Sequence, residues 1–398
     1  KYNSRETMKI LMLVQFLSPT RGGGEVMFYQ LAHGLTYRGH EIYVIKHKIL
    51  NSDEDNIGRF GKITIYDIYP PIEHKGGLPA SIIQNLLYVI NAVRYGIKII
   101  RKESINLIHA NNYSPILAGW LLSKITRRPL LVTIHDTTLT YKGEFWKKWM
   151  KQFGRLSTVK ALIGHIFELL TIKISENIHT VSETSKNDIL QLKYGNKKIY
   201  VIPNALNLKF YAGNDNVEYR NEVVFIGRLV FYKNLEVVLE ALSCIFNHNF
   251  KFIVIGDGPM REYWQKLANN LSILDKVEFR GYVSHEEKRE ILRKASVLVL
   301  PSLFEGFGMV ILEAWAYKKP IIVANVPPLN QIVTHYKNGF VADPFNPKEW
   351  AKYILLTINN TKLAEKLGMD GYKKLIKEYN IDSWIDEFEK LYKQLLIE

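Results

Sequence analysis

The sequence predicts an α/β protein with two doubly wound domains, and three features of the chain support this prediction. Runs of β-branched and other apolar residues alternate with amphipathic runs, which is typical of parallel strands covered by helices on both faces. The alternation restarts near residue 221, and 398 residues exceed the size of one ordinary domain. We expect domains at 1–203 and 204–378, and a final helix at 379–398 that crosses back to the first domain.

In the first domain, apolar runs predict strands at residues 10–16, 41–45, 106–110, 130–136, 178–182 and 198–204. A helix is expected after the glycine turn at 21–24 and ends at Gly39. The run that opens at Met8 also resembles a signal peptide, but it is short, stops at Pro19 and lacks a small-residue cleavage site. We interpret it as the first buried strand.

In the second domain, strands are predicted at residues 221–229, 251–259, 277–283, 296–302, 320–324 and 340–343. Amphipathic runs at 234–246, 260–271 and 284–295 predict helices between the first four of them. Ligands of open parallel sheets bind beyond the C-terminal ends of the strands. Two such domains that face each other would leave a ligand cleft between these ends.

Composition and charge narrow the functional classes. Hydrophobic residues make up 47% of the chain and charged residues 23%, as in ordinary globular proteins. The single cysteine, Cys244, excludes a disulfide framework and a multi-thiol metal site. Residues 1–200 contain 28 basic and 15 acidic residues and carry nearly all of the net charge of +14. The first half is therefore expected to face an anionic partner: a membrane surface, an acidic glycan or a nucleic acid.

Glycine turns and cations mark possible anion sites. No complete G-x-G-x-x-G or Walker motif occurs. The turn at 21–24 lies between a strand and a helix, where backbone N–H groups can approach an anion, although a flexible turn is the alternative. Arg228 and Lys233 follow a strand end, and two such cations suit a diphosphate unless they belong to a solvated loop.

Three further side chains lie where a ligand is expected. His135 ends an apolar strand and so points toward the cleft, with a structural histidine as the alternative; His109 has a similar position and weaker support. Glu305 precedes the glycine turn 306–308, and Glu313 lies about two helical turns further on in an apolar run. Both carboxylates could accept hydrogen bonds from ligand hydroxyls, or Glu313 could pair with a core polar group.

These residues together resemble a known family. Glu305-x7-Glu313, with GRLVFYKN, GDGP and RGYVS upstream in that order, resembles the retaining glycosyltransferases of family 4, which have the GT-B fold. The N-terminal glycine loop and TIHD fit as well, so the resemblance spans residues 8 to about 343. Each motif alone is modest, and their common order and spacing make the resemblance specific.

The resemblance implies a role for each matching residue. The expected catalytic residues are His135, at the donor sugar, Arg228 and Lys233, at the leaving diphosphate, and Glu305, at the transferred sugar. Glu313 would bind the ribose hydroxyls of the donor. The other donor-binding residues would be Gly23, Gly24, Gly256, Tyr282, Val283, Lys288, Gly306, Phe307, Gly308, Met309 and Val310.

The chemistry agrees with this set. Glycosyl transfer passes through an oxocarbenium-like state, and the leaving diphosphate needs stabilisation by cations and helix-start amides. No second carboxylate is evident as a nucleophile, so retention is expected by a front-face route in which the leaving phosphate assists. The family generally needs no metal or other cofactor, and the chain lacks an Asp-x-Asp pair.

A basic aromatic segment at residues 142–173 predicts an acceptor at a membrane surface. Cations beside aromatic residues suit an anionic lipid interface, while an amphipathic helix packed on the sheet is the alternative. The candidates are Trp146, Lys147, Lys148, Trp149, Lys151 and Arg155. No apolar run reaches the roughly 18 residues of a membrane span. We expect a cytoplasmic protein at the inner face of the membrane that acts on a glycan or lipid-linked acceptor.

Other functions remain open at this point. A GT-B nucleotide-sugar epimerase or a phosphorylase would share the architecture, although the ordered pairs Glu305/Glu313 and Arg228/Lys233 favour a transferase. A non-enzymatic binding protein for small molecules, nucleotides or nucleic acid is the alternative from another class. No nucleic-acid partner is expected, because neither aromatic stacking surfaces nor a known binding motif is evident.

Overall fold

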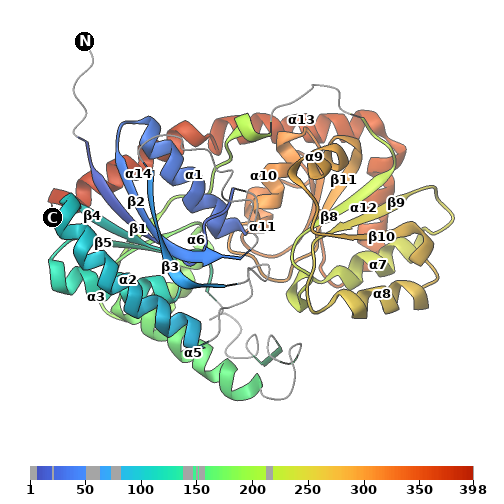
Figure 1. Ribbon diagram of the computed structural model, residues 1–398. Helices are drawn as coiled ribbons and strands as arrows, with labels where there is room; N and C mark the ends of the chain where they lie inside the picture. Colours follow the sequence, from blue (N-terminus) through green and yellow to red (C-terminus); the bar gives the residue numbers. More distant parts are fainter. Residues whose placement is uncertain are drawn as a thin grey trace, which may run out of the picture. The chain divides into compact units, whose positions relative to one another are not determined.

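The computed structural model describes residues 7–19, 22–50, 63–72, 82–137, 147–148, 151, 157–211 and 218–397 (Figure 1). The chain divides into two compact units. Unit 1 comprises residues 1–140, 162–204 and 381–398, and unit 2 comprises 141–161 and 205–380. Helix α14 (Ile381–Ile397) thus belongs to the same unit as the N-terminal strands.

Unit 1 is built on a seven-stranded sheet with the order β3-β2-β1-β4-β5-β6-β7, in which every neighbouring pair is parallel. The strands are β1 (Lys9–Leu13), β2 (Glu41–Ile49), β3 (Ile63–Ile72), β4 (Leu107–Ala110), β5 (Leu130–Ile134), β6 (Asn177–Thr180) and β7 (Lys198–Val201). The run from Met8 is the central strand β1, as predicted, and its residues 10–14 are fully buried.

The sequence did not predict strand β3. It lies at the edge of the sheet and pairs only with β2 among the described strands. Most of its residues are at least partly exposed, so it lacks the continuous apolar run of a central strand. Pro70 and Pro71 near its end also weaken a strand pattern, and proline is tolerated at a sheet edge because no ladder hydrogen bond is lost there.

The helices of unit 1 are α1 (Gly23–Tyr37), α2 (Ile82–Glu103), α3 (Ser114–Thr126), most of α5 (Ser157–Ile174), α6 (Glu183–Gln191) and α14. Helices α1 and α14 pack on one another on one side of the sheet, and α2 and α3 pack on one another on the other side (Figure 1). A Cβ atom on Gly34 of α1 would collide with Ile385 of α14, so glycine allows this close packing.

Buried polar contacts fix α14 to the sheet. His40 Nε2 lies 2.6 Å from Glu389 Oε1, and His109 Nδ1 lies 2.7 Å from the Tyr392 hydroxyl oxygen. The other ring nitrogen of His109 lies 2.7 Å from Thr133 Oγ1. The sequence suggested a possible ligand contact for His109, but its fully buried ring is occupied by these structural partners.

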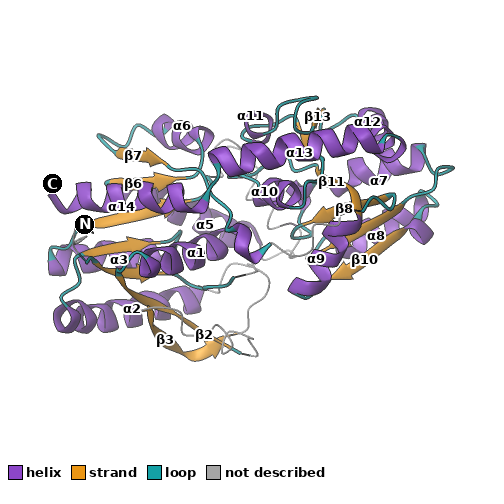
Figure 2. Cartoon of the chain, turned by 90° about the horizontal axis from the view of Figure 1, so that it is seen from above, coloured by secondary structure: helices purple, strands orange, loops and turns teal. Residues whose placement is uncertain are grey.

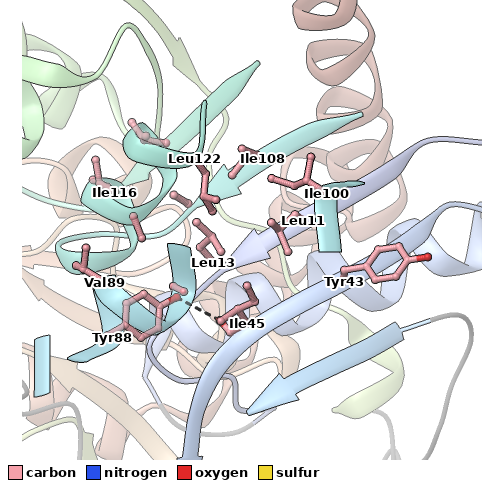
Figure 3. Close-up of a cluster of buried hydrophobic side chains, with 14 of the residues drawn as sticks. Leu11, Leu13, Tyr43, Ile45, Tyr88, Val89, Ile100, Ile108, Ile116 and Leu122 are labelled. Carbon is pink, nitrogen blue, oxygen red and sulfur yellow. Dashed lines mark hydrogen bonds between the residues drawn. The ribbon is translucent and has the colours of Figure 1, made fainter. Parts of the chain in front are cut away.

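One core cluster of unit 1 lies between the sheet and α2 and α3. Leu11, Leu13, Ile45 and Ile108 from the strands meet side chains of α2 and α3 (Figure 3). Tyr88 of α2 is fully buried among them and donates a hydrogen bond of 3.2 Å to the Ile45 carbonyl oxygen.

Unit 2 repeats this architecture with six parallel strands in the order β10-β9-β8-β11-β12-β13. The strands are β8 (Glu222–Ile226), β9 (Lys251–Ile255), β10 (Val277–Gly281), β11 (Ala295–Leu300), β12 (Ile321–Ala324) and β13 (Phe340–Ala342). The helices are α7 (Leu235–Cys244), α8 (Arg261–Asn270), α9 (His285–Lys294), α10 (Met309–Ala316), α11 (Leu329–Ile332), α12 (Pro347–Asn359) and α13 (Thr361–Glu378). Figure 2 shows helices, in purple, packed over the strands of each unit, in orange.

Each unit is therefore a doubly wound, Rossmann-like domain, and the predicted fold class is confirmed. All strands of a parallel sheet end at the same edge, so loops that are far apart in sequence meet there. Within the described residues, no helix combines the length and apolarity needed to cross a membrane.

Candidate functional site

Lys233 and Glu305 form an ion pair at the carboxyl edge of the unit 2 sheet. Lys233 ends a short 3₁₀ helix (Phe231–Lys233) after β8, and Glu305 follows the neighbouring strand β11. The Lys233 ammonium donates to Glu305 Oε1, and Ser302 Oγ donates to the same oxygen at 2.8 Å. The two charged side chains are only 12% and 14% exposed, so the pair is partly desolvated and held in a defined orientation.

Arg228 lies on the same loop, five residues before Lys233. One terminal guanidinium nitrogen of Arg228 donates to the Tyr232 hydroxyl at 3.1 Å. The Lys233 ammonium lies 5.5 Å from the centre of the Tyr232 ring. The tyrosine thus contacts both cations, and the loop carries two positive charges at the edge where ligands of such sheets bind.

The loop that carries Arg228 packs closely against the GDG motif and is hydrogen-bonded to it and to the residues after it. Leu229 donates its backbone N–H to the Asp257 carbonyl at 2.9 Å, and Met260 donates to the Leu229 carbonyl at 2.9 Å. Gly256 has a φ of 124°, and a Cβ there would collide with the Gly227 carbonyl oxygen. Loop packing is therefore sufficient to explain glycine at position 256, which the sequence resemblance assigned to donor binding.

The segment 306–310 forms the start of α10. Gly308 is the N-cap residue with a left-handed φ of 94°, and a Cβ there would lie 2.8 Å from Leu329 Cδ2. Phe307 is 5% exposed, and its ring packs edge-on against Tyr379 at 5.7 Å. Phe307 can thus offer a ligand only its backbone, whereas Met309 and Val310 are half-buried and Gly306 is buried.

Glu313 has two protein partners. The Lys288 ammonium lies 2.8 Å from Glu313 Oε1 and 2.7 Å from Oε2. Tyr211 donates its hydroxyl to Oε1 at 3.3 Å, and burial together with the Glu313 charge raises the pKa of Tyr211 well above its ordinary value. The side chains of Lys288 and Glu313 are 18% and 12% exposed.

Sequence reasoning did not find the role of Tyr211, because no spacing relates residue 211 to α10. The resemblance suggested Lys288 as a weaker candidate near the base of the donor, and the structure shows its ammonium on the Glu313 carboxylate. The other base candidates, Tyr282 and Val283, lie between β10 and α9; the Tyr282 side chain is 53% exposed and that of Val283 is half-buried.

In unit 1, the structure brings His135 next to the start of α1. A Cβ on Gly24 would lie 2.7 Å from His135 Nε2, so only glycine leaves room for the ring. Nε2 lies 2.9 Å from Asn111 Oδ1. Burial, with a smaller contribution from His179, lowers the pKa of His135 to about 3. The ring is therefore neutral at physiological pH and can donate a hydrogen bond through Nε2. Gly23 is the first residue of the same helix.

The structure describes only some of the residues that the sequence predicts at a membrane surface or acceptor. Lys147, Lys148 and Lys151 are exposed. Trp146, Trp149 and Arg155 lie outside the described residues. In the part of the chain that the structure describes, no group of three or more His, Cys, Asp or Glu side chains is arranged to hold a metal ion.

Comparison with known proteins matches both halves of the chain to glycosyltransferase families. Residues 21–210 match the family model "Glycosyltransferase Family 4", and residues 211–374 match "Glycosyl transferases group 1". An uncharacterized glycosyltransferase of Methanocaldococcus jannaschii is 30% identical over 341 residues, which cover 84% of this chain and 89% of that protein.

Solved structures with the same fold cover nearly the whole chain. Sucrose-phosphate synthase from Thermosynechococcus elongatus has a TM-score of 0.81 at 20% identity, covering 98% of this chain and 99% of that one. Anabaena HepE in complex with UDP and glucose has a TM-score of 0.72 at 19% identity, covering 97% of this chain and 100% of that one. The fold is therefore GT-B. With both halves matched by family models and a 30% identical relative that covers 84% of the chain, the chain belongs to the family 4 glycosyltransferases.

Proposed function

We propose that this glycosyltransferase moves a sugar, with retention of configuration and without a metal ion, from a nucleotide-diphosphate sugar to a lipid-linked or membrane-surface glycan. The proposed donor rests on one observation, the set of groups that meets at the carboxyl edge of the unit 2 sheet. The loops there carry two cations, a carboxylate that is paired with one of these cations, and the start of α10. A nucleotide-diphosphate sugar has the matching chemistry: a diphosphate and two sets of hydroxyl groups.

The diphosphate is assigned to Arg228, Lys233 and the start of α10. Arg228 offers a planar fork of N–H donors and Lys233 a compact positive charge. The amides at the start of α10 lack partners within the helix and favour an anion. Together these groups would stabilise the negative charge that grows on the leaving nucleotide. Because this set supplies cations and amides, the proposal needs no metal at the diphosphate.

The two carboxylates are assigned to hydroxyl groups. Glu305 would accept from the transferred sugar while Lys233 and Ser302 hold its Oε1 atom. Glu313 would accept from the ribose while Lys288 and Tyr211 hold its position. An ionised carboxylate has about four lone-pair sites, so hydroxyl groups can bind beside these protein partners. Gly256 would contribute by placing the loop that carries Arg228.

His135 is assigned to the donor sugar, and Gly23 and Gly24 to the backbone beside it. With its Nε2–H donated to Asn111 Oδ1, the neutral imidazole can contact a sugar but cannot act as a general acid, because its pKa of about 3 leaves it unprotonated at neutral pH. Retention then proceeds by the front-face route, in which the leaving phosphate oxygen takes the proton of the acceptor hydroxyl as the new glycosidic bond forms. No acid or base from the protein is required in that step.

The donor assignment can be tested directly. A thermal-shift screen of UDP-, GDP- and ADP-sugars should show stabilisation by one nucleotide class, and UDP-sugars are the first to test because the solved relative HepE was crystallised with UDP. Stabilisation grows with the ratio of ligand concentration to dissociation constant. If no nucleotide sugar shifted the melting temperature while oligonucleotides did, the donor proposal would fall.

The rival reactions are separated by a second assay. An epimerase or a phosphorylase can share the GT-B fold, but neither moves a sugar from a nucleotide donor to a glycan acceptor. A transferase releases the nucleotide much faster when an acceptor glycan is added, whereas an epimerase changes the donor sugar with no acceptor present. The ¹H NMR signal of the product's anomeric proton would report whether configuration is retained, and turnover that survives EDTA would support metal independence.

A further inference from the structure

The outward face of helix α2 carries an unusual combination of side chains. Ile83, Leu86 and Ile90 are 70%, 59% and 54% exposed. Arg94, Lys98 and Arg101 follow at the same spacing and are also exposed. Residues spaced by three or four lie on one face of a helix. The six side chains, named here the α2 stripe, thus form one line that is apolar in its first half and cationic in its second.

The opposite face of α2 is fixed in the core of unit 1. Tyr88, Val89, Ala92, Ile99 and Ile100 are buried there, and Figure 3 labels Tyr88, Val89 and Ile100. The helix therefore cannot turn its exposed apolar side chains inward without emptying the core. Large aliphatic side chains that stay exposed at consecutive turns of a helix commonly mark a surface that binds a partner.

The cations of the α2 stripe are available to a partner. Among the residues that the structure describes, no carboxylate lies within ion-pair distance of Arg94, Lys98 or Arg101. The next cation, Lys102, pairs with Glu103 at 3.2 Å. This agrees with the excess of basic over acidic residues in the first 200 positions of the chain.

We propose that the α2 stripe is a binding surface for an anionic lipid bilayer. Aliphatic side chains at the start of the stripe would enter the boundary between headgroups and acyl chains, and the arginine and lysine side chains would meet lipid phosphates. A protein partner fits this surface less well, because protein interfaces are enriched in aromatic residues and the stripe contains none. The proposal deepens the proposed function, since an acceptor that is anchored in a membrane requires the enzyme to reach that membrane.

A second exposed apolar stripe, on α5, supports the proposal that this side of unit 1 binds a membrane. Leu162, Ile166 and Leu170 of α5 are 59%, 54% and 43% exposed and are spaced by four residues. Helix α5 lies on the same side of the unit 1 sheet as α2 and α3 (Figure 1). This side therefore offers exposed apolar side chains on two of its helices, whereas a helix that only caps the sheet normally shows a polar outer face.

The first test is vesicle co-sedimentation of the full-length protein with phosphatidylcholine vesicles, with and without 30 mol % phosphatidylglycerol. Two variants remove the two halves of the stripe: Ile83→Ser/Leu86→Ser/Ile90→Ser and Arg94→Gln/Lys98→Gln/Arg101→Gln. A matched control, Lys362→Gln/Lys366→Gln/Lys377→Gln, removes the same charge from exposed positions of α13. All substituted side chains are exposed, so the variants should fold.

We expect the wild type to bind only the anionic vesicles, both stripe variants to bind at least ten times more weakly, and the α13 control to bind like the wild type. Equal losses in the cation variant and the α13 control would mean that net charge alone drives binding, and would overturn the proposal. No wild-type binding at low salt would also overturn it. If the apolar variant instead converted a dimer to a monomer with vesicle binding unchanged, a second copy of the chain would be the occupant.

A second test locates the contact. In a Cys244→Ser background, a single cysteine at Leu86→Cys is labelled with an environment-sensitive dye, and Lys366→Cys serves as the control position. Anionic vesicles should shift the emission of the dye at position 86 to the blue and leave that at position 366 unchanged. A blue shift at neither or at both positions would contradict the proposal. Donor binding by thermal shift is measured in parallel: loss of donor binding with retained vesicle binding would reject the proposed function and leave this surface standing.

Discussion

Lys288 and Glu313 form an ion pair between helices α9 and α10, with the ammonium 2.7 Å from Oε2 and 2.8 Å from Oε1. The contact explains how a carboxylate can lie in the apolar run of α10. A buried charge is tolerated when it is paired and hydrogen-bonded, and Tyr211 adds a third contact. The pair also changes what Glu313 can do, because any ribose that binds it meets a carboxylate that is already oriented.

The change Glu313→Gln tests this carboxylate as a donor-binding group. The amide keeps the size of the side chain and its bond from Tyr211, but it removes the negative charge that both Lys288 and ribose hydroxyls would use. We expect the dissociation constant for the nucleotide to rise roughly 10- to 100-fold, a loss of about 1.4–2.8 kcal/mol, with a smaller effect on turnover. Isothermal titration calorimetry measures it, with the exposed Glu262→Gln on α8 as a control. Unchanged affinity would make Glu313 a purely structural residue.

The change Lys233→Ala tests the leaving-group charge. It removes a cation placed beside Arg228 and leaves Glu305 with its Ser302 contact. Loss of one preorganised donor to developing charge commonly lowers turnover by about 10²–10³-fold, so we expect kcat to fall by that order while the melting temperature changes little. Steady-state kinetics and circular dichroism give both quantities. The control is Lys266→Ala, an exposed cation on α8 that pairs with Glu262 at 3.1 Å.

The sequence predicted most of the strands and the loops of the candidate site, and the exceptions have physical causes. Central strands such as β1 and β8 are continuous apolar runs because both faces are covered. The edge strand β3 was not predicted, because a half-exposed strand with prolines lacks a continuous apolar run. The glycine and charged motifs indicated the unit 2 candidate site because they lie directly after strands, where the chain must reach the sheet edge.

Contacts that depend on packing could not be predicted. Nothing in the sequence relates Tyr211 to Glu313, which lie 102 positions apart. Nor does the GDG motif reveal that Gly256 makes room for the Gly227 carbonyl oxygen. The exposed aliphatic line on α2 was not predicted either, because only the packing of the helix shows that Ile83 and Leu86 lie on its exposed face.

The change Gly24→Ala tests the position of His135. Alanine suits a helix better than glycine does, but its Cβ would lie 2.7 Å from His135 Nε2 and would push the ring away from Asn111. Misplacement of a positioned group by about 1 Å can cost about 100-fold in rate. We therefore expect kcat to fall by that order, with a free energy of unfolding within about 1 kcal/mol of the wild type. Full activity in this variant would show that His135 does not contact the donor.

Buried histidines predict a loss of stability in acid. His179 is fully buried, with Nδ1 2.9 Å from Thr133 Oγ1 and Nε2 3.0 Å from the Ile202 carbonyl oxygen. Burial lowers the pKa of His179 to about 4, and it lowers the pKa of His109 well below its ordinary value. In the unfolded chain the imidazole titrates near 6.5. Below that pH the unfolded state binds a proton that the folded state does not, so stability is complete above about pH 6.5 and is lost as the pH falls toward 4.

The change His179→Gln removes one of these groups and should make the pH dependence shallower. A single histidine shifted this far contributes a loss of about 3 kcal/mol across that window. Urea unfolding at several pH values between 4.5 and 7.5 measures the slope of the free energy of unfolding against pH. The variant is expected to be less stable than the wild type at pH 7.5, because a packed, hydrogen-bonded ring is lost, and to lose less stability on acidification. His248→Gln, at an exposed position, should keep the wild-type slope, and an unchanged slope in His179→Gln would mean that the buried ring does not resist protonation.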